Sequence, residues 1–139
     1  MQYDISGSQN KIYEGMAGYW QTAEGEVADF MNSLPKMVFS RTLKAADWAN
    51  TTLINDDAGL AIRKLKQQGA GNMFVFGSGN LSATFIREGL FDEYRLLIAP
   101  VILGDGNPLF GHGLSRQTLT LLESKPLASG GVILRYAPK

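Results

Sequence analysis

The sequence predicts an α/β fold in which a mostly parallel, mixed sheet is flanked by helices and closes with an antiparallel hairpin. Up to Gly89, segments with a helical spacing of apolar residues alternate with short apolar or β-branched runs, a pattern typical of parallel strands joined by helices. Beyond Gly89, strand-like runs follow one another, and the last two flank Ser129–Gly131, which suits a hairpin turn. In such a sheet, ligands are expected at the carboxyl ends of the strands.

The first third of the chain predicts an edge strand and two helices. The polar opening, Met1–Lys11, offers only a frayed edge strand. The segment Ile12–Tyr19 is expected to form a short helix, with Trp20 packed beneath it. A second helix is expected over Ala23–Leu34 with Thr22 as its N-cap, because apolar residues recur there at helical spacing. Its expected apolar face consists of Val27, Phe30, Met31 and Leu34.

Two short strands and a third helix are predicted next. Pro35 ends the preceding helix, and the apolar run Met37–Phe39 and the β-branched run Thr51–Ile54 both indicate strands. Asp56 is expected to cap a helix that Gly69 closes. The apolar face of this helix comprises Ala58, Ala61, Ile62 and Leu65.

The segment Asn72–Glu88 predicts a strand, a turn and a helix in the order that a nucleotide-binding unit needs. The continuous apolar run Met73–Phe76 indicates a strand that is covered on both faces. Gly77–Asn80 then interrupts it, and from Leu81 the apolar spacing becomes helical. Such a turn leaves the first helical N–H groups unpaired at the positive end of the helix dipole, which favours a phosphate.

The last third predicts strands. Glu93–Leu103 indicates one strand, which runs to a turn over Gly104–Pro108. Leu109 and Phe110 are then expected to return to the core. The strands expected to form the hairpin contain Leu119–Leu122 and Val132–Tyr136.

Length and composition indicate a single domain over residues 1–139. The chain has 13 basic and 13 acidic side chains, and no cluster of Lys or Arg points to nucleic acid or to an anionic membrane. The absence of cysteine excludes disulfides and thiolate metal sites. Because no apolar run approaches the length of a membrane span and no leader is apparent, we expect a cytoplasmic protein. The single histidine, His112, has no assignable partners, so neither a metal site nor a catalytic triad is expected.

Two stretches are candidate phosphate sites. The first comprises Ser40, Arg41 and Thr42, since hydroxyls and a guanidinium at the end of a strand suit a phosphate. The second comprises Gly77, Ser78, Gly79, Asn80 and Leu81 at a helix start. Each has a simpler interpretation. The first can be read as a solvated loop arginine. The second can be read as a tight turn capped by Ser78 or Asn80, because the third glycine of the dinucleotide fingerprint and the lysine of a P-loop are lacking.

Four motifs in one order resemble a known family. They are YEGMAGYW at Tyr13–Trp20, MNSLPKMVFSRTL at Met31–Leu43, FVFGSGNLSATFIREGLFDEYRLLIAPVILGDGNPLF at Phe74–Phe110, and the closing SGGVILRY. Together they resemble the bacterial dihydrofolate reductase-like proteins related to the C-terminal reductase domain of riboflavin biosynthesis. The resemblance covers nearly everything from Tyr13 onward.

This resemblance implies a three-layer dihydrofolate reductase-like fold and an NADPH-dependent reductase of a small pteridine- or pyrimidine-like substrate. It also implies a homodimer and no metal. Carried over to this sequence, Ser40 and Arg41 would meet the adenosine phosphate of the cofactor, and Gly77–Asn80 would hold its pyrophosphate. The turn Gly104–Asn107 would lie near the nicotinamide or the substrate.

The sequence departs from the family in two places. The family usually has Gly-Arg-x-Thr ahead of the Tyr-Glu pair, where this chain has Gln9, Asn10, Lys11 and Ile12. The resemblance also implies that roughly forty residues, with a central strand, are missing ahead of Met1, so that Met1–Ser8 or a partner chain is expected to fill the gap.

Two functional hypotheses follow. The first is an NADPH-dependent oxidoreductase domain that passes a hydride to a small unsaturated heterocycle, with no catalytic residue assigned. The alternative is a truncated, non-catalytic module of the same fold that binds a nucleotide or forms a dimer.

Overall fold

The computed structural model describes residues 2–5, 10–69, 71–76, 78–106, 108–111 and 113–139. It divides into two compact units, Met1–Thr84 and Phe85–Lys139, and the helix at the boundary belongs to both. The prediction of an α/β class is confirmed, because four helices alternate with or precede strands in these described residues.

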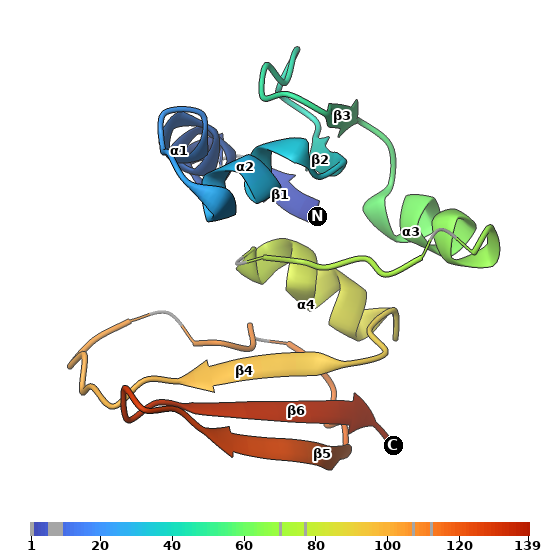
Figure 1. The fold of residues 1–139 in the computed structure, drawn as a ribbon. Helices are drawn as coiled ribbons and strands as arrows, with labels where there is room; N and C mark the ends of the chain where they lie inside the picture. Colours follow the sequence, from blue (N-terminus) through green and yellow to red (C-terminus); the bar gives the residue numbers. More distant parts are fainter. Residues whose placement is uncertain (1, 6–9, 70, 77, 107, 112) are drawn as a thin grey trace. The chain divides into compact units, whose positions relative to one another are not determined.

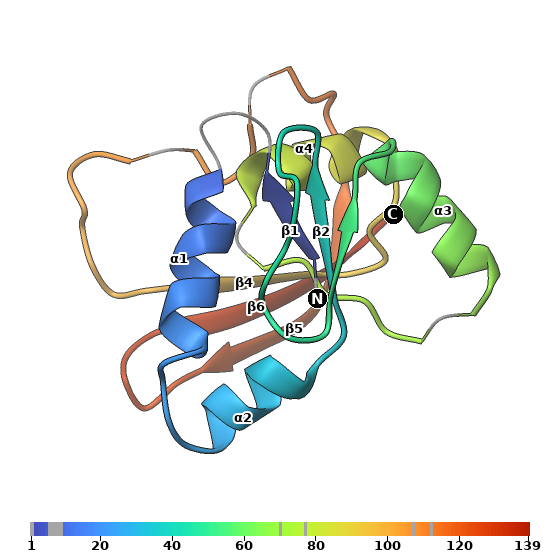
Figure 2. The ribbon, with the colours of Figure 1, turned by 90° about the horizontal axis from the view of Figure 1, so that it is seen from above.

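The first unit contains a three-stranded parallel sheet in the order β1-β2-β3. Its strands are β1 (Gln2–Ile5), β2 (Lys36–Ser40) and β3 (Thr51–Ile54). Ile5 is level with Ser40, and Phe39 is level with Ile54, so the three strands end almost together. Figure 2 shows them side by side, pointing the same way. The expected edge strand near the N-terminus and the two strands that follow are thus confirmed.

Two helices and a buried tryptophan form the core of this unit. Helix α1 (Asn10–Trp20) packs against β1 and against α2 (Glu26–Ser33). The buried cluster comprises Tyr13, Ala17, Met31, Val38 and Trp48, with Trp20 and Leu34 packed against it. The backbone N–H of Trp48 donates to the Tyr13 hydroxyl at 3.0 Å, which ties the loop before β3 to α1.

Helix α2 differs from the expectation at its start and on its outer face. The residue before it is Gly25, at φ 101°, and no side chain caps the helix. The Thr22 hydroxyl instead donates to the carbonyls of Gly18 and Tyr19 at the end of α1, so its prediction as N-cap was wrong. Val27 and Phe30 are mostly exposed, and α2 buries Ala28 and Met31.

The second half of this unit contains α3 (Ala58–Gln67) and the start of α4 (Gly79–Arg87). Both helices were expected. The strand predicted over Met73–Phe76 was wrong, because only Val75 makes a bridge and no ladder continues it. A strand covered on both faces would bury its side chains, whereas Phe74 and Phe76 are 44% and 45% exposed.

The second unit contains an antiparallel sheet in the order β4-β6-β5. Its strands are β4 (Tyr94–Ile98), β5 (Leu119–Pro126) and β6 (Val132–Pro138), which Figure 1 shows with alternating directions. The predicted hairpin of β5 and β6 is confirmed, with Leu127 N–H donating to the Gly131 carbonyl at 2.8 Å across the turn. The strands described therefore form two separate sheets where one mixed sheet was expected.

Several apolar side chains of the second unit lie on its surface. The strand expected to extend through Leu103 ends at Ile98, and Ile102 and Leu103 are 96% and 81% exposed. Leu109 and Phe110, expected in the core, are 62% and 42% exposed. In the described part of the chain, no helix has the length and apolarity to cross a membrane.

Candidate phosphate site at the carboxyl edge of the parallel sheet

The carboxyl ends of β1, β2 and β3 share one edge of the parallel sheet. Beyond this edge the chain continues with Arg41 and Thr42 after β2, and with Asn55 and Asp56 after β3. The segment that follows β1, residues 6–9, lies outside the described residues. Ligands of open α/β sheets bind at this edge, which makes it the candidate site of the first unit.

Ser40 shapes the loop that begins there. Its side chain is buried, and its Oγ accepts hydrogen bonds from the N–H groups of Thr42 at 3.2 Å and Leu43 at 2.9 Å. The Thr42 hydroxyl lies 3.5 Å from the same oxygen. Ser40 therefore folds the loop back on itself, and this leaves the side chains of Arg41 and Thr42 exposed to solvent.

The helix that follows β3 is capped by a different aspartate from the one expected. Asp57 Oδ1 accepts from the N–H of Leu60 at 2.9 Å, so the prediction of Asp56 as N-cap was wrong by one residue. Asp56 is exposed and makes no hydrogen bond or ion pair with any residue that the structure describes. Its carboxylate therefore does not cap α3. The sequence did not show which aspartate is the cap, because Asp56 and Asp57 are consecutive.

The second candidate group lies at the start of α4. Gly77 is outside the described residues. Ser78 is fully buried and caps the helix, since its Oγ accepts from Leu81 N–H at 3.4 Å and its carbonyl accepts from Ser82 N–H at 2.9 Å. Leu81 is buried by its side chain. Within the described residues, the N–H groups of Gly79 and Asn80 have no acceptor and are the free donors of this turn.

Both groups fit a phosphate by their chemistry. A Cβ built at Gly79 would meet no described atom within 4 Å apart from the neighbouring residues and the backbone of α4, so this side of the turn is not filled by other described segments. Arg41 adds an exposed guanidinium, the side chain best suited to a phosphate by its geometry. No hydrogen bond or ion pair joins the first group to the second among the residues that the structure describes.

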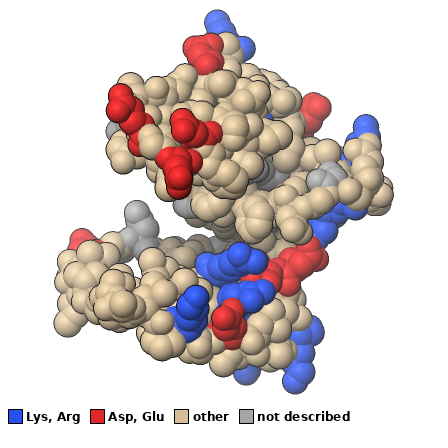
Figure 3. All heavy atoms as spheres, viewed as in Figure 1, with Lys and Arg blue, Asp and Glu red and all other residues tan. Residues whose placement is uncertain are grey.

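Charge is unevenly distributed over the first unit although the whole chain is neutral. Residues 12–35 contain four acidic side chains and no Lys or Arg, and Figure 3 shows red side chains gathered over α1 and α2. Residues 58–86 contain three basic side chains and no Asp or Glu, and blue side chains lie over α3. An anionic ligand is therefore repelled from the α1–α2 surface.

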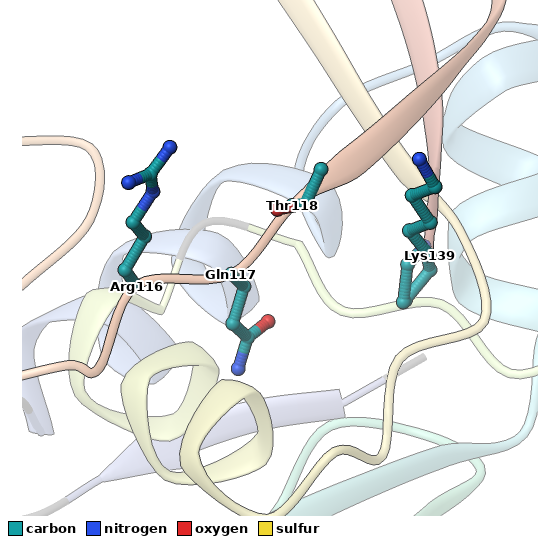
Figure 4. A pocket seen from close by; sticks show the side chains of 5 residues that line it. Arg116, Gln117, Thr118 and Lys139 are labelled. Carbon is teal, nitrogen blue, oxygen red and sulfur yellow. The ribbon is translucent and has the colours of Figure 1, made fainter.

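A pocket in the second unit is a weaker candidate. It has a volume of about 430 Å³ and is lined by Arg116, Gln117, Thr118, Pro138 and Lys139. Figure 4 shows Arg116 and Lys139 on the two sides of this depression. The Gln117 amide already donates to the Ile86 carbonyl at 2.9 Å, and Lys139 N–H donates to the Thr118 carbonyl at 3.0 Å. The first bond connects the chain that enters β5 to α4, and the second holds the end of β6 beside that chain, so these lining residues contribute to the fold.

A catalytic group is not identified by the geometry. Glu14, the acidic residue of α1, is exposed. His112 and Asn107 lie outside the described residues. No group of three or more His, Cys, Asp or Glu suited to a metal ion occurs in the part of the chain that was described.

Comparison with known proteins identifies a family that this chain matches. The family model of the RibD C-terminal domain matches residues 9–133. The Bacillus subtilis (strain 168) protein YyaP is 37% identical over 113 residues, which are 81% of this chain and 60% of YyaP. A putative riboflavin biosynthesis protein from Shewanella sp. PV-4 matches with a TM-score of 0.68 and 24% identity, covering 77% of this chain and 62% of that chain. A pyrimidine reductase-like protein from Corynebacterium diphtheriae matches with a TM-score of 0.56 and 17% identity, covering 75% of this chain and 50% of that chain.

The chain thus spans less than two thirds of each of these three relatives. The two solved structures share its fold, and the family match covers nearly the same stretch as the four sequence motifs. This confirms the expected kinship with the reductase domain of riboflavin biosynthesis. The chain belongs to the RibD C-terminal domain family.

Proposed function

We propose that the chain is an oxidoreductase domain that binds NADPH and transfers its hydride to a small pteridine- or pyrimidine-like molecule. The observation that carries the proposal is the carboxyl edge of the parallel sheet, where the loop folded by Ser40 presents Arg41 to solvent. Membership of the RibD C-terminal domain family supports it. The choice of substrate class draws on the likeness to a pyrimidine reductase-like protein.

The residues of the two candidate groups would divide the cofactor between them. Arg41 and Thr42 would hold the phosphate on the adenosine ribose, with Ser40 keeping their loop in shape. The free N–H groups of Gly79 and Asn80, with Gly77 and Leu81 beside them, would bind the pyrophosphate at the start of α4. The bound nicotinamide supplies the hydride, and the protein contributes orientation and the exclusion of water.

The proposal extends to assembly and location. We propose a homodimer of single-domain chains that acts in the cytoplasm on a small-molecule substrate. The exposed apolar side chains of the second unit, including Ile102 and Leu103, offer surface for association. No role for a metal, nucleic acid or membrane is included.

The experiment that tests cofactor binding compares NADPH with NADH in the Arg41→Ala variant. The affinity for NADPH should fall roughly tenfold or more, because the charge-assisted contact to the extra phosphate is lost, whereas NADH should change little. Binding is followed by the fluorescence of the nicotinamide. Lys44→Ala is the matched control, since it removes an exposed cation from the same loop. Equal weakening of both nucleotides by Arg41→Ala would contradict the assignment.

A non-catalytic nucleotide-binding or dimerisation module is the second candidate. It is favoured by the exposed apolar surface of the second unit and by the lack of an identified proton donor. It predicts that NADPH raises the melting temperature, because a ligand that binds only the folded state stabilises it, while no substrate in a pteridine and pyrimidine panel is reduced. Oxidation of NADPH with any member of that panel would exclude it.

A further inference from the structure

Helix α3 presents an apolar side chain that is flanked by positive charge. Leu60 is 64% exposed and lies on the side of α3 opposite to the buried Ile62. Arg63 and Lys64 are three and four residues further along the helix, so they share this side with Leu60, and both are exposed. Residues 58–86 contain three basic side chains and no Asp or Glu. We call Leu60, Arg63 and Lys64 the α3 face.

Helix α2 presents the opposite charge around apolar side chains. Val27 and Phe30 are 64% and 60% exposed, and their spacing of three residues sets them on one side of the helix. Glu26 is four residues before Phe30 and borders the same side, and Glu24 lies just before the helix. Both carboxylates are exposed, and residues 12–35 contain no Lys or Arg. We call Glu26, Val27 and Phe30 the α2 face.

Helix dipoles explain the charges of these two faces but not the apolar side chains among them. Acidic residues suit the start of α2 and basic residues suit the end of α3, because each offsets the partial charge of its own helix end. Neither helix gains from leaving Val27, Phe30 or Leu60 in water, since burial of apolar area is favourable. Both helices belong to the first unit, and Figures 1 and 2 show them apart. Because their apolar side chains are exposed, the two faces are not paired within one chain.

We propose that the α2 face packs against the α3 face of a second copy of this chain. The apolar side chains meet at the centre of the contact, and the carboxylate of Glu26 lies opposite Arg63 and Lys64. An apolar centre with complementary charges at its edge gives an interface both stability and specificity. The inference does not depend on NADPH binding, and the contact uses no residue of the second unit.

The size of the two faces sets the expected strength of the contact. Helices α2 and α3 have 8 and 10 residues. One contact between two such short helices is smaller than a specific, stable interface, which buries at least about 1,200 Å². We therefore expect a dissociation constant in the micromolar range or weaker. The attraction between the charges should also weaken as salt is raised from about 0.1 M to about 1 M.

The test measures the sedimentation of the full chain at low salt, from micromolar to millimolar concentrations. Phe30→Lys sets a cation against the basic α3 face, and Leu60→Asp sets a carboxylate against the acidic α2 face. Each should raise the dissociation constant of self-association roughly tenfold or more. Thr120→Lys adds the same charge as Phe30→Lys at an exposed position of β5 and should leave the dissociation constant unchanged.

Folding of the variants is checked separately, by circular dichroism and thermal melting. The replaced side chains are exposed, so each variant should keep the wild-type spectrum. Val27→Lys and Lys64→Glu change the same two faces and take the place of a variant that does not fold.

A mixture of the two variants tests the pairing of the faces directly. A Phe30→Lys chain keeps a native α3 face, and a Leu60→Asp chain keeps a native α2 face. An equimolar mixture therefore regains one native contact for each pair of chains and should associate more tightly than either variant alone. The new pair of Lys and Asp contributes little, because an exposed ion pair is weak. A mixture that associates no more tightly than its components would overturn the inference.

The other outcomes distinguish this contact from association of another kind. A wild-type chain that stays monomeric up to millimolar concentration overturns the inference. Association that persists unchanged in both Phe30→Lys and Leu60→Asp also overturns it, and leaves the second unit as the place of contact. If Thr120→Lys weakens association as much as Phe30→Lys, net charge is the cause and the inference fails.

Discussion

Lys36 is a charged side chain that the first unit buries almost completely. It is 1% exposed, and its ammonium donates to the carbonyls of Met31 at 3.1 Å, Asn32 at 3.1 Å and Leu34 at 2.8 Å. The same nitrogen lies 4.6 Å from the centre of the Trp48 ring. Burial lowers the pKa of Lys36, while three acceptors and an aromatic face stabilise the charged form. Lys36 thus adds hydrogen bonds to carbonyls at the end of α2, next to the C-cap residue Leu34.

Replacing Lys36 tests how much its hydrogen bonds contribute to the free energy of unfolding. Lys36→Met keeps the apolar stem but leaves two carbonyls of α2 and that of Leu34 without this donor, so the free energy of unfolding should fall by about 2–4 kcal/mol. Urea unfolding followed by tryptophan fluorescence measures the change. Lys44→Met, at an exposed position, should change it by less than about 0.5 kcal/mol. Similar losses in both variants would show that the buried contacts contribute little.

Ion pairs across the antiparallel sheet connect all three of its strands. Glu93, just before β4, accepts from Arg135 Nε at 2.8 Å and Nη2 at 2.9 Å, and from Arg95 Nε at 2.6 Å. Arg135 of β6 also donates to Glu123 of β5 at 2.9 Å. The hydrogen bonds from Arg135, then the one from Arg95, lower the pKa of Glu93 from 4.5 to about 2. The bidentate geometry with Arg135 gives this contact more weight than a single exposed pair.

The shifted pKa predicts how acid acts on this sheet. Because the folded pKa of Glu93 lies below its ordinary value, its stabilising effect is complete above pH 4.5 and is lost as the pH falls towards about 2. Glu93→Gln should therefore lower the melting temperature at neutral pH and reduce its decline over that acid range. Melting curves by circular dichroism at several pH values measure this. A variant that keeps the full acid decline of wild type would show that other carboxylates cause it.

The helices and most strands were predictable because local signals specify them. Apolar spacing located α1, α3 and α4, and the hairpin of β5 and β6 followed from the glycines between two apolar runs. Predictions that depend on contacts with another element of the fold were wrong. The run Met73–Phe76 looks like a strand, yet it pairs only at Val75. Val27 and Phe30 have the spacing of a buried face, but only packing decides which side of a short helix is covered.

The candidate site was predictable in part for the same reason. A strand followed by Ser40, Arg41 and Thr42 can be read from the chain, and the structure shows how Ser40 folds that loop. That the strand ending at Ser40 lies next to the strand ending at Ile54 depends on the pairing of β2 with β3, which adjacent sequence does not encode. Between two consecutive aspartates, the choice of Asp57 as cap likewise depends on backbone geometry.

At the scale of the whole molecule, we predict that thermal unfolding is cooperative. The structure divides into Met1–Thr84 and Phe85–Lys139, and α4 runs across the boundary. If the chain is one domain, as we propose, heating should give a single calorimetric transition whose enthalpy equals the van't Hoff enthalpy, because a shared helix cannot melt in one unit alone. Two resolved transitions, or a calorimetric enthalpy well above the van't Hoff value, would indicate units that unfold separately.

The placement of the two tryptophans has an optical consequence. Trp20 and Trp48 both belong to the first unit, and Trp48 is 1% exposed and donates from its indole N–H to Asn32 at 2.6 Å. Residues 85–139 contain tyrosine and phenylalanine but no tryptophan. Emission excited near the red edge of indole absorption therefore reports on the first unit alone, so the protein has an intrinsic fluorescent probe for Met1–Thr84.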